Sequence, residues 1–187
     1  YGLGLSGKSA FKFLKRNNVK KIYTWDDKKK LEANKKFNSF KKALDKVDYI
    51  VISPGINIKK TSLKSILIKN KKKIITDLDL FYMQKLSVKS IMVTGTNGKS
   101  TTCKLIQHVL KTNKIDAQLG GNIGKPILDL KIKKNTIIII EASSFQLFYL
   151  RFVKPTFAII LNITKDHLDW HETFKTIKIT NSRDFQN

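Results

Sequence analysis

The sequence predicts an α/β protein with mainly parallel sheets, built from two nucleotide-binding domains in series. Short runs rich in isoleucine and valine alternate with segments of helical pattern, which favours parallel strands joined by helices. Two glycine-rich loops, GLGLSGKSAF at 2–11 and VTGTNGKSTT at 93–102, each precede a helical pattern. The second follows a strand-like run, and the first follows what we interpret as the tail of a strand. The stretch MQKLSVKS at 83–90 separates them. We therefore expect domains at 1–87 and 88–187.

The most apolar runs are the expected strands, at 20–25, 48–53, 91–95, 136–142 and 157–163. Each is short and bounded by polar or turn residues, as strands covered on both faces are. Helices are expected between them, at 8–17, 39–46, 63–70 and 99–113. In the last of these, the i, i+1, i+4, i+5 spacing predicts one apolar helix face, formed by Leu105, Ile106, Val109 and Leu110.

The first glycine loop has the pattern G-x-G-x-x-G, at Gly2, Gly4 and Gly7. Asp26 ends the next expected strand, about 20 residues further on, as in Rossmann-like dinucleotide sites. The glycines let the backbone approach a diphosphate, and the helix N-terminus stabilises its charge. A carboxylate at Asp26 can accept hydrogen bonds from a ribose or a uracil. These features suit NAD and any other nucleoside diphosphate, so a nicotinamide-dependent oxidoreductase stays open at this point.

The second glycine loop is similar to the phosphate-binding pattern G-x-x-x-x-G-K-[ST], except that Val93 stands where the first glycine belongs. Gly95 and Gly98 permit a tight turn. Lys99 can reach the outer phosphates of ATP, and Ser100 can ligate magnesium. The loop therefore predicts an ATP site.

Two further polar residues follow strands in the same half of the chain. Glu141 ends an all-isoleucine run, and His167 follows another run within NITKDHLDWH, between Asp166 and Asp169. In α/β sheets, ligands bind at the carboxyl ends of the strands. We therefore expect both side chains at the nucleotide site, with Glu141 placed to bind Mg²⁺.

Composition narrows the classes of function. The formal net charge is +23, but only three of the 37 basic residues are arginine, the better bidentate reader of phosphate. A solvated basic surface is therefore favoured over nucleic-acid binding. The apolar runs are far shorter than the about 20 residues of a membrane-spanning helix. Cys103 is the single cysteine, which rules out an internal disulfide and favours a reducing compartment. We expect a cytoplasmic monomer with no nucleic-acid or membrane partner.

Six motifs in order resemble the Mur ligase superfamily, which builds the peptidoglycan peptide and includes folylpolyglutamate synthetase. They are GLGLSG, VISPG, GTNGKST, GGNIGKP, EASSFQL and LNITKDHLDWH. The ATP loop of that family lacks the first Walker glycine, so Val93 is consistent with it. The segment SSFQL, at 143–147, is most similar to the members that add D-glutamate. The resemblance runs from the first residues to about His171.

The resemblance implies an ATP-dependent amide ligase that adds D-glutamate to UDP-N-acetylmuramoyl-L-alanine. ATP would phosphorylate the carboxylate of the substrate, and the amine of D-glutamate would attack the acyl phosphate, with no covalent enzyme intermediate. The N-terminal Rossmann-like domain would then bind a UDP sugar in place of NAD, and a P-loop-type ATPase domain would follow. Another amino-acid ligase of the same superfamily is the first alternative, and a nicotinamide-dependent oxidoreductase is the second.

The resemblance also implies roles for individual residues. The catalytic residues would be Lys99, Glu141 and His167, and the magnesium ligands Ser100, Glu141 and His167. The ATP site would comprise Gly95, Thr96, Asn97, Gly98, Lys99, Ser100 and Thr101. The substrate site would comprise Leu5, Ser6, Asp26, Ser53, Pro54, Gly55, Asn122 and Ser143.

The chain departs from the family pattern after the histidine motif. Family members carry a lysine there, commonly in a Tyr-x-x-x-Lys pattern, that becomes carbamylated and assists a magnesium ion. In this chain, Ile177 stands at the tyrosine position and Asn181 at the lysine position of the nearest match to that pattern. Lys175 and Lys178 are nearby but do not have the required spacing. The third domain of the family, which binds the adenine side and D-glutamate, has no counterpart in this sequence. We therefore expect an N-terminal fragment that is inactive as a ligase by itself.

Overall fold

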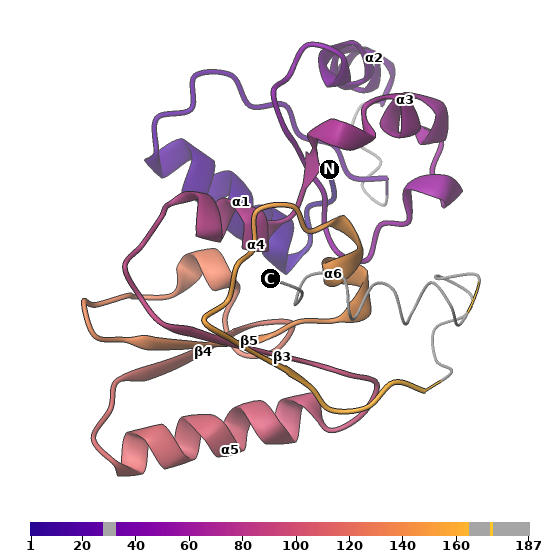
Figure 1. The fold of residues 1–187 in the computed structure, drawn as a ribbon. Helices are drawn as coiled ribbons and strands as arrows, with labels where there is room; N and C mark the ends of the chain where they lie inside the picture. The colour runs from indigo at the N-terminus through magenta and orange to yellow at the C-terminus, as the bar shows by residue number, and fades with distance from the viewer. Residues whose placement is uncertain (28–32, 165–172, 174–187) are drawn as a thin grey trace.

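The structure is a computed structural model that describes residues 1–27, 33–164 and 173. Helices and strands alternate along most of the described chain (Figure 1). The helices are α1 (Leu5–Arg16), α2 (Ala33–Leu44), α3 (Lys64–Lys69), α4 (Asp77–Met83), α5 (Lys99–Thr112) and α6 (Ser144–Tyr149). The strands are β1 (Ile50–Val51), β2 (Ile74–Ile75), β3 (Ser90–Thr94), β4 (Ala117–Gly121), β5 (Ile137–Glu141) and β6 (Phe157–Ile160).

Every strand pair in the described residues is parallel, which confirms the predicted mixed α/β class with parallel sheets. The larger sheet has the order β4-β5-β3-β6, and β1 pairs with β2 in a smaller sheet. Helix α5 covers one face of the larger sheet, and α1, α4 and α6 lie on the other side (Figure 1). The carboxyl ends of β3, β4 and β5 therefore meet at one edge of the sheet.

Several predicted elements differ in the structure. The expected strand at 20–25 is wrong, because this segment forms no ladder; the Trp25 carbonyl accepts one hydrogen bond from the Gly2 amide at 2.8 Å. Strands β2 and β4 and helices α4 and α6 were not expected from the sequence. The β4 segment AQLGG contains two glycines and carries a weak strand signal. It becomes an edge strand because β5 offers it a parallel partner.

The apolar face of α5 is also shifted from the predicted stripe. Cys103 is buried, and Ile106 and Leu110 pack with it in the cluster that contains Val93 and Ile139. Leu105 and Val109, by contrast, are 60% and 50% exposed. The prediction of one common face for the four residues Leu105, Ile106, Val109 and Leu110 is therefore wrong in its register.

The main hydrophobic cluster joins the two halves of the chain. It contains Ala10 of α1 and Leu78 of α4 together with Met92 of β3 and Ile138 of β5. A second cluster surrounds β1 and β2 and includes Tyr149 at the end of α6. Helix α6 thus contributes to the packing of the N-terminal half. The boundary at residues 87 and 88 stays a prediction.

Asp79 fixes the start of α4 and the chain after α6. It is fully buried and forms a reciprocal capping box with Thr76. Its Oδ2 accepts from the Thr76 amide at 2.8 Å and from the Thr76 hydroxyl at 3.0 Å. Its Oδ1 accepts from the amides of Arg151 at 2.8 Å and Phe152 at 2.7 Å. Both carboxylate oxygens are therefore used as acceptors.

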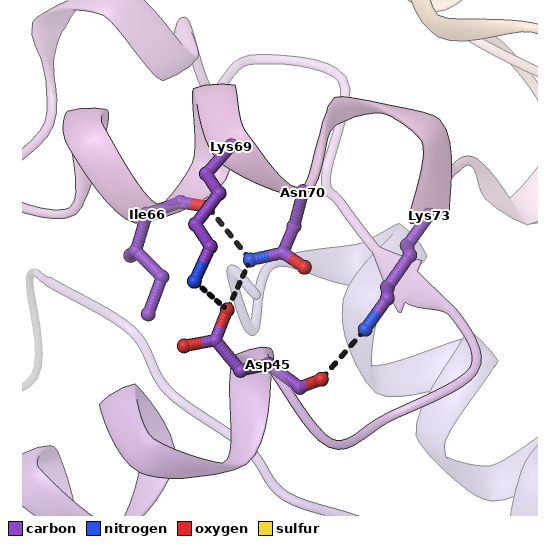
Figure 2. Close-up of polar contacts among 5 residues, drawn as sticks. All are labelled: Asp45, Ile66, Lys69, Asn70 and Lys73. Atoms are coloured by element: carbon purple, nitrogen blue, oxygen red, sulfur yellow. Dashed lines mark hydrogen bonds and ion pairs between the residues drawn. The ribbon is translucent and has the colours of Figure 1, made fainter.

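Asp45 makes a comparable set of contacts at the surface (Figure 2). Its Oδ1 accepts from the Asn70 side chain at 2.8 Å and lies 3.3 Å from the Lys69 ammonium. Its carbonyl accepts from Lys73 at 2.7 Å. The hydrogen bond from Asn70, followed by the contact with Lys69, lowers the pKa of Asp45 below its usual value. These contacts join the chain after α2 to the end of α3 but leave the carboxylate in water.

We expect Asp79→Asn to lower the free energy of unfolding by about 3 kcal/mol, because the new amide group would face hydrogen-bond donors and leave two of them unpaired. Urea unfolding followed by circular dichroism measures the change. Asp45→Asn is the control, and its midpoint should stay close to that of the wild type because exposed ion pairs contribute little. Equal midpoints for Asp79→Asn and the wild type would contradict the prediction.

Candidate nucleotide and metal site

The second glycine loop connects β3 to α5. Gly98, the N-cap of α5, has φ +85°, and Gly95 has φ +143°. A Cβ on Gly95 would lie 3.0 Å from the carbonyl oxygen of Asn162. Both positions therefore favour glycine. The Lys99 ammonium donates to the carbonyls of Gly95 at 2.7 Å and Thr96 at 2.8 Å, which holds its charge against the loop.

Glu141 ends the strand β5, between the carboxyl ends of β3 and β4. Val93 of β3 and Gly121 of β4 are in register with Glu141 on either side. Glu141 Oε2 accepts from the Ser100 hydroxyl at 2.7 Å, and Oε1 accepts from the Asn122 side chain at 2.8 Å. The structure thus brings together Ser100 of the predicted ATP loop, Glu141 of the predicted metal ligands and Asn122 of the predicted substrate site.

This cluster suits a divalent cation. Glu141 is only 1% exposed, and the two hydrogen bonds to its carboxylate come from neutral donors. A buried negative charge is costly unless a cation or metal offsets it. The hydroxyl of Ser100 and the carboxylate of Glu141 are oxygen ligands of the kind Mg²⁺ prefers. The same charge acts on the buried Cys103 thiol, whose pKa rises to about 12, mainly through burial and secondarily through Glu141.

The third predicted metal ligand, His167, lies outside the described residues, as do Asn181 and the lysines near it. In the parts of the chain that the structure describes, no three His, Cys, Asp or Glu side chains gather in a way that could hold a metal ion. Of the predicted ligand set, the structure therefore places Ser100 and Glu141 side by side. The role of His167 stays a prediction.

Asn162 supports the glycine loop and was not expected from the sequence. Its carbonyl and its side-chain oxygen accept from the amides of Thr96 and Asn97, each at 2.9 Å, and its Nδ2 donates to the Asn97 carbonyl at 2.9 Å. The Thr164 amide also donates to the Thr96 hydroxyl at 3.0 Å. Asn162 follows β6, so the argument that ligands bind at carboxyl ends of strands could have identified it.

The first glycine loop lies against two of the predicted substrate residues. The Leu3 amide donates to Asp26 Oδ2 at 2.6 Å. The Ser53 hydroxyl donates to the Gly2 carbonyl at 3.0 Å. Gly2 has φ +87°, and a Cβ there would lie 2.7 Å from the Ser53 side chain. Asp26, Ser53 and the loop therefore form one group, with Pro54 and Gly55 next along the chain.

A cavity of about 830 Å³ adjoins this loop. Ser6 and Ser53 line it, together with apolar side chains from α1 and β1 such as Ala10, Leu14 and Val51. Leu5, a predicted substrate residue, is 80% exposed at the start of α1. The first loop and this cavity thus place Ser6 and Ser53 in one concave region.

Ser143 is the N-cap of α6. Its hydroxyl accepts from the Gln146 amide at 3.4 Å, and the Gln146 side chain accepts from the Ser143 amide at 3.0 Å. Gln146 is buried. Ser143 is two residues after Glu141, the last residue of β5. Its role toward phosphate or substrate stays a prediction.

Two comparisons of the sequence with known proteins agree on one family. The Mur ligase middle domain matches residues 93–185. The chain is 33% identical to the UDP-N-acetylmuramoylalanine–D-glutamate ligase of Caldicellulosiruptor bescii in an alignment 203 positions long, which covers 100% of this chain and 44% of that protein. It is 38% identical to the ligase of the same name from Rickettsia bellii, covering 94% of this chain and 40% of that protein.

A solved structure of the UDP-N-acetylmuramate:L-alanyl-gamma-D-glutamyl-meso-diaminopimelate ligase from Neisseria meningitides aligns with a TM-score of 0.45 and 20% identity, covering 78% of this chain and 52% of that one. No helix in the described residues is both long and apolar enough to cross a membrane. The chain spans less than half the length of the two curated relatives. By its sequence, the chain belongs to the Mur ligase family.

Proposed function

We propose that this chain forms the UDP-sugar-binding and ATP-binding parts of a ligase that adds D-glutamate to UDP-N-acetylmuramoyl-L-alanine. A Rossmann-like domain over 1–87 holds the UDP sugar, and a P-loop-type ATPase domain begins at 88. The observation that carries the proposal is the buried carboxylate of Glu141 at the end of β5. It accepts hydrogen bonds from Ser100, directly after the glycine loop, and from Asn122. The names of the relatives, at 33% and 38% identity, supply the substrates.

The proposed chemistry is phosphoryl transfer followed by amide formation. A carboxylate oxygen of the substrate attacks the γ-phosphorus of ATP, and ADP leaves. The amine of D-glutamate then attacks the acyl carbon, phosphate leaves, and the amine loses a proton. Neither step needs a covalent bond to the protein, so the task of the chain is to position the reactants and to offset charge.

The residues at the sheet edge suit that task. Lys99 and the amides of the glycine loop hold the β- and γ-phosphates, with Thr101 in the first turn of α5. Ser100 and Glu141, with His167, would hold Mg²⁺, which would offset the charge between two anions. Asn122 orients Glu141 and approaches the phosphate or the substrate. The Asn162 contacts keep the loop in its shape before ATP binds.

The first glycine loop is assigned to the UDP end of the substrate. Asp26 and Ser53 already contact the loop backbone, and Leu5, Ser6, Pro54, Gly55 and Ser143 complete the proposed substrate site. We infer that the protein acts in the cytoplasm as a monomer. The lone cysteine, Cys103, is buried on α5, which suits a reducing compartment.

The test is ADP release by the whole protein with UDP-N-acetylmuramoyl-L-alanine, ATP, Mg²⁺ and bicarbonate. D-glutamate should drive release, and L-alanine or meso-diaminopimelate should not. Release driven by another amino acid would place the protein among the sister ligases. Calorimetric titration separates the cofactor alternatives, since we expect the UDP sugar to bind and NAD to bind more weakly or not at all. Tighter binding of NAD would overturn the assignment of the first loop.

A further inference from the structure

Tyr149, the last residue of α6, is inserted into the loop that follows β1. Its hydroxyl donates to the Ile56 carbonyl and accepts from the Ile58 amide, both at 3.2 Å. The side chain is buried and packs with Ile52 and Leu63 in the cluster around β1. These contacts join residues more than 90 positions apart in the sequence. Burial raises the pKa of the Tyr149 hydroxyl above its ordinary value.

The loop held by Tyr149 is the one that carries Ser53, Pro54 and Gly55. The Ile56 amide donates to the Ser53 carbonyl at 3.0 Å, which closes a turn over these residues. The Ser53 side chain donates to the Gly2 carbonyl at 3.0 Å and so continues the contact into the first glycine loop. A displacement of Ile56 would therefore be passed to Ser53 and to the glycine loop.

The other end of α6 is close to Glu141 in the sequence. The helix begins at Ser144, with Ser143 as its cap, and Glu141 ends β5 two residues before that cap. Asp79 holds the chain directly after α6 through the amides of Arg151 and Phe152. The C-terminal end of α6 is thus held by Asp79 and by the 53–58 loop, and its N-terminal end follows Glu141 in the chain.

We propose that Tyr149 is a positioning residue for the UDP-sugar site: its hydroxyl holds the 53–58 loop at a set distance from the nucleotide site through α6. The inference rests on the proposed function, because it assigns the 53–58 loop to the UDP sugar. Tyr149 is buried and acts through its hydrogen bonds to Ile56 and Ile58. Its effect is on binding of the UDP sugar before any chemistry takes place.

Tyr149→Phe keeps the ring in the cluster and removes both hydrogen bonds. The Ile58 amide and the Ile56 carbonyl lose their partner, and the turn over Ser53 becomes less constrained. Because the loss applies equally to the ground state and the transition state, the KM for the UDP sugar should rise about 5-fold to 10-fold. The kcat and the KM for ATP should stay within about twofold of the wild-type values.

The matched control is Tyr82→Phe. Tyr82 on α4 shares a hydrogen bond of 2.8 Å with the Ser90 hydroxyl and is half-buried, so this change also removes a hydroxyl contact from a packed tyrosine. It should leave the KM for the UDP sugar unchanged. A rise for Tyr149→Phe alone supports the proposal. Equal KM values for the two variants, or a rise in the KM for ATP as large as that for the UDP sugar, overturn it.

Failure of the proposed function is recognised separately. If the wild-type protein releases no ADP with D-glutamate, the ligase reaction is refuted, and the role of Tyr149 is judged by calorimetric titration with UDP-N-acetylmuramoyl-L-alanine. Binding at least about 5-fold weaker in Tyr149→Phe than in wild type and Tyr82→Phe still supports the positioning role. Equal affinities, or no binding by the wild type, overturn it. Hydrogen exchange of the Ile58 amide reports on its bond to the Tyr149 hydroxyl. Faster exchange in Tyr149→Phe than in the wild type and Tyr82→Phe supports the proposal, and unchanged exchange contradicts it.

Discussion

Replacing Lys99 with alanine is expected to lower the turnover of the whole protein in the proposed ligase reaction about a hundredfold or more, with the fold intact. The ammonium of Lys99 is already held against the loop by the carbonyls of Gly95 and Thr96. There it can meet the charge that develops on the migrating phosphoryl group. A contact of that kind contributes roughly 3 kcal/mol or more in the transition state, and each 1.36 kcal/mol corresponds to about tenfold in rate.

The measurement is the steady-state rate of ADP release at saturating substrates. Lys104→Ala is the control, because Lys104 is on the same helix but is exposed to solvent. It removes the same charge without touching the loop and should leave the rate close to wild type. A near-wild-type rate for Lys99→Ala would mean that this loop is not the ATP site.

Replacing Glu141 with glutamine is expected to lower kcat/KM about a hundredfold or more and to raise the Mg²⁺ concentration needed for half-maximal rate. The change preserves the shape of the side chain and removes the negative charge that the cation would balance. Loss of charge stabilisation by a bound metal is worth several kcal/mol in the transition state. Titration of the rate with Mg²⁺ at fixed ATP measures both effects.

The stability of Glu141→Gln separates a metal ligand from a structural residue. In the described structure the carboxylate receives hydrogen bonds from Ser100 and Asn122, both neutral, so its charge is a cost to the ligand-free fold. The Ser100 hydroxyl and the Asn122 side chain can accept as well as donate, unlike the backbone amides at Asp79, so they can still pair with a glutamine. The glutamine variant should therefore unfold at the same or a higher urea concentration than the wild type. A marked loss of stability together with an unchanged Mg²⁺ requirement would show that Glu141 serves the fold and not the metal. Asp79→Asn, by contrast, is expected to lose stability, because each oxygen of the Asp79 carboxylate accepts two hydrogen bonds.

Much of the fold could be predicted from local patterns. The isoleucine run that became β5 and the valine-containing run that became β3 are strong strand signals because both faces are buried. Weak segments were missed. Strand β4 contains two glycines, and α6 is a six-residue helix whose start depends on the contact between Ser143 and Gln146. Such elements exist because neighbours pair or cap them, and local propensity does not contain that information.

Helix α5 illustrates the same limit at the level of one face. The sequence period correctly indicates an amphipathic helix, but it predicts a stripe through Leu105 and Val109, which the structure leaves exposed. The sheet contacts only a narrow strip of the helix, and Cys103, Ile106 and Leu110 occupy that strip. Periodicity defines the faces of a helix, whereas the direction in which the helix meets the sheet decides which face is buried.

The sequence by itself determined the two glycine loops, the parallel α/β class and the polar residues at strand ends, because each depends on residues close together in the chain. Only the tertiary structure decided that Glu141 lies between Ser100 and Asn122, that Asn162 holds the glycine loop, and that Tyr149 reaches the 53–58 loop. These contacts join residues between 19 and 93 positions apart. Their geometry follows from strand order and helix packing, which are set by burial over the whole chain and not by any one segment.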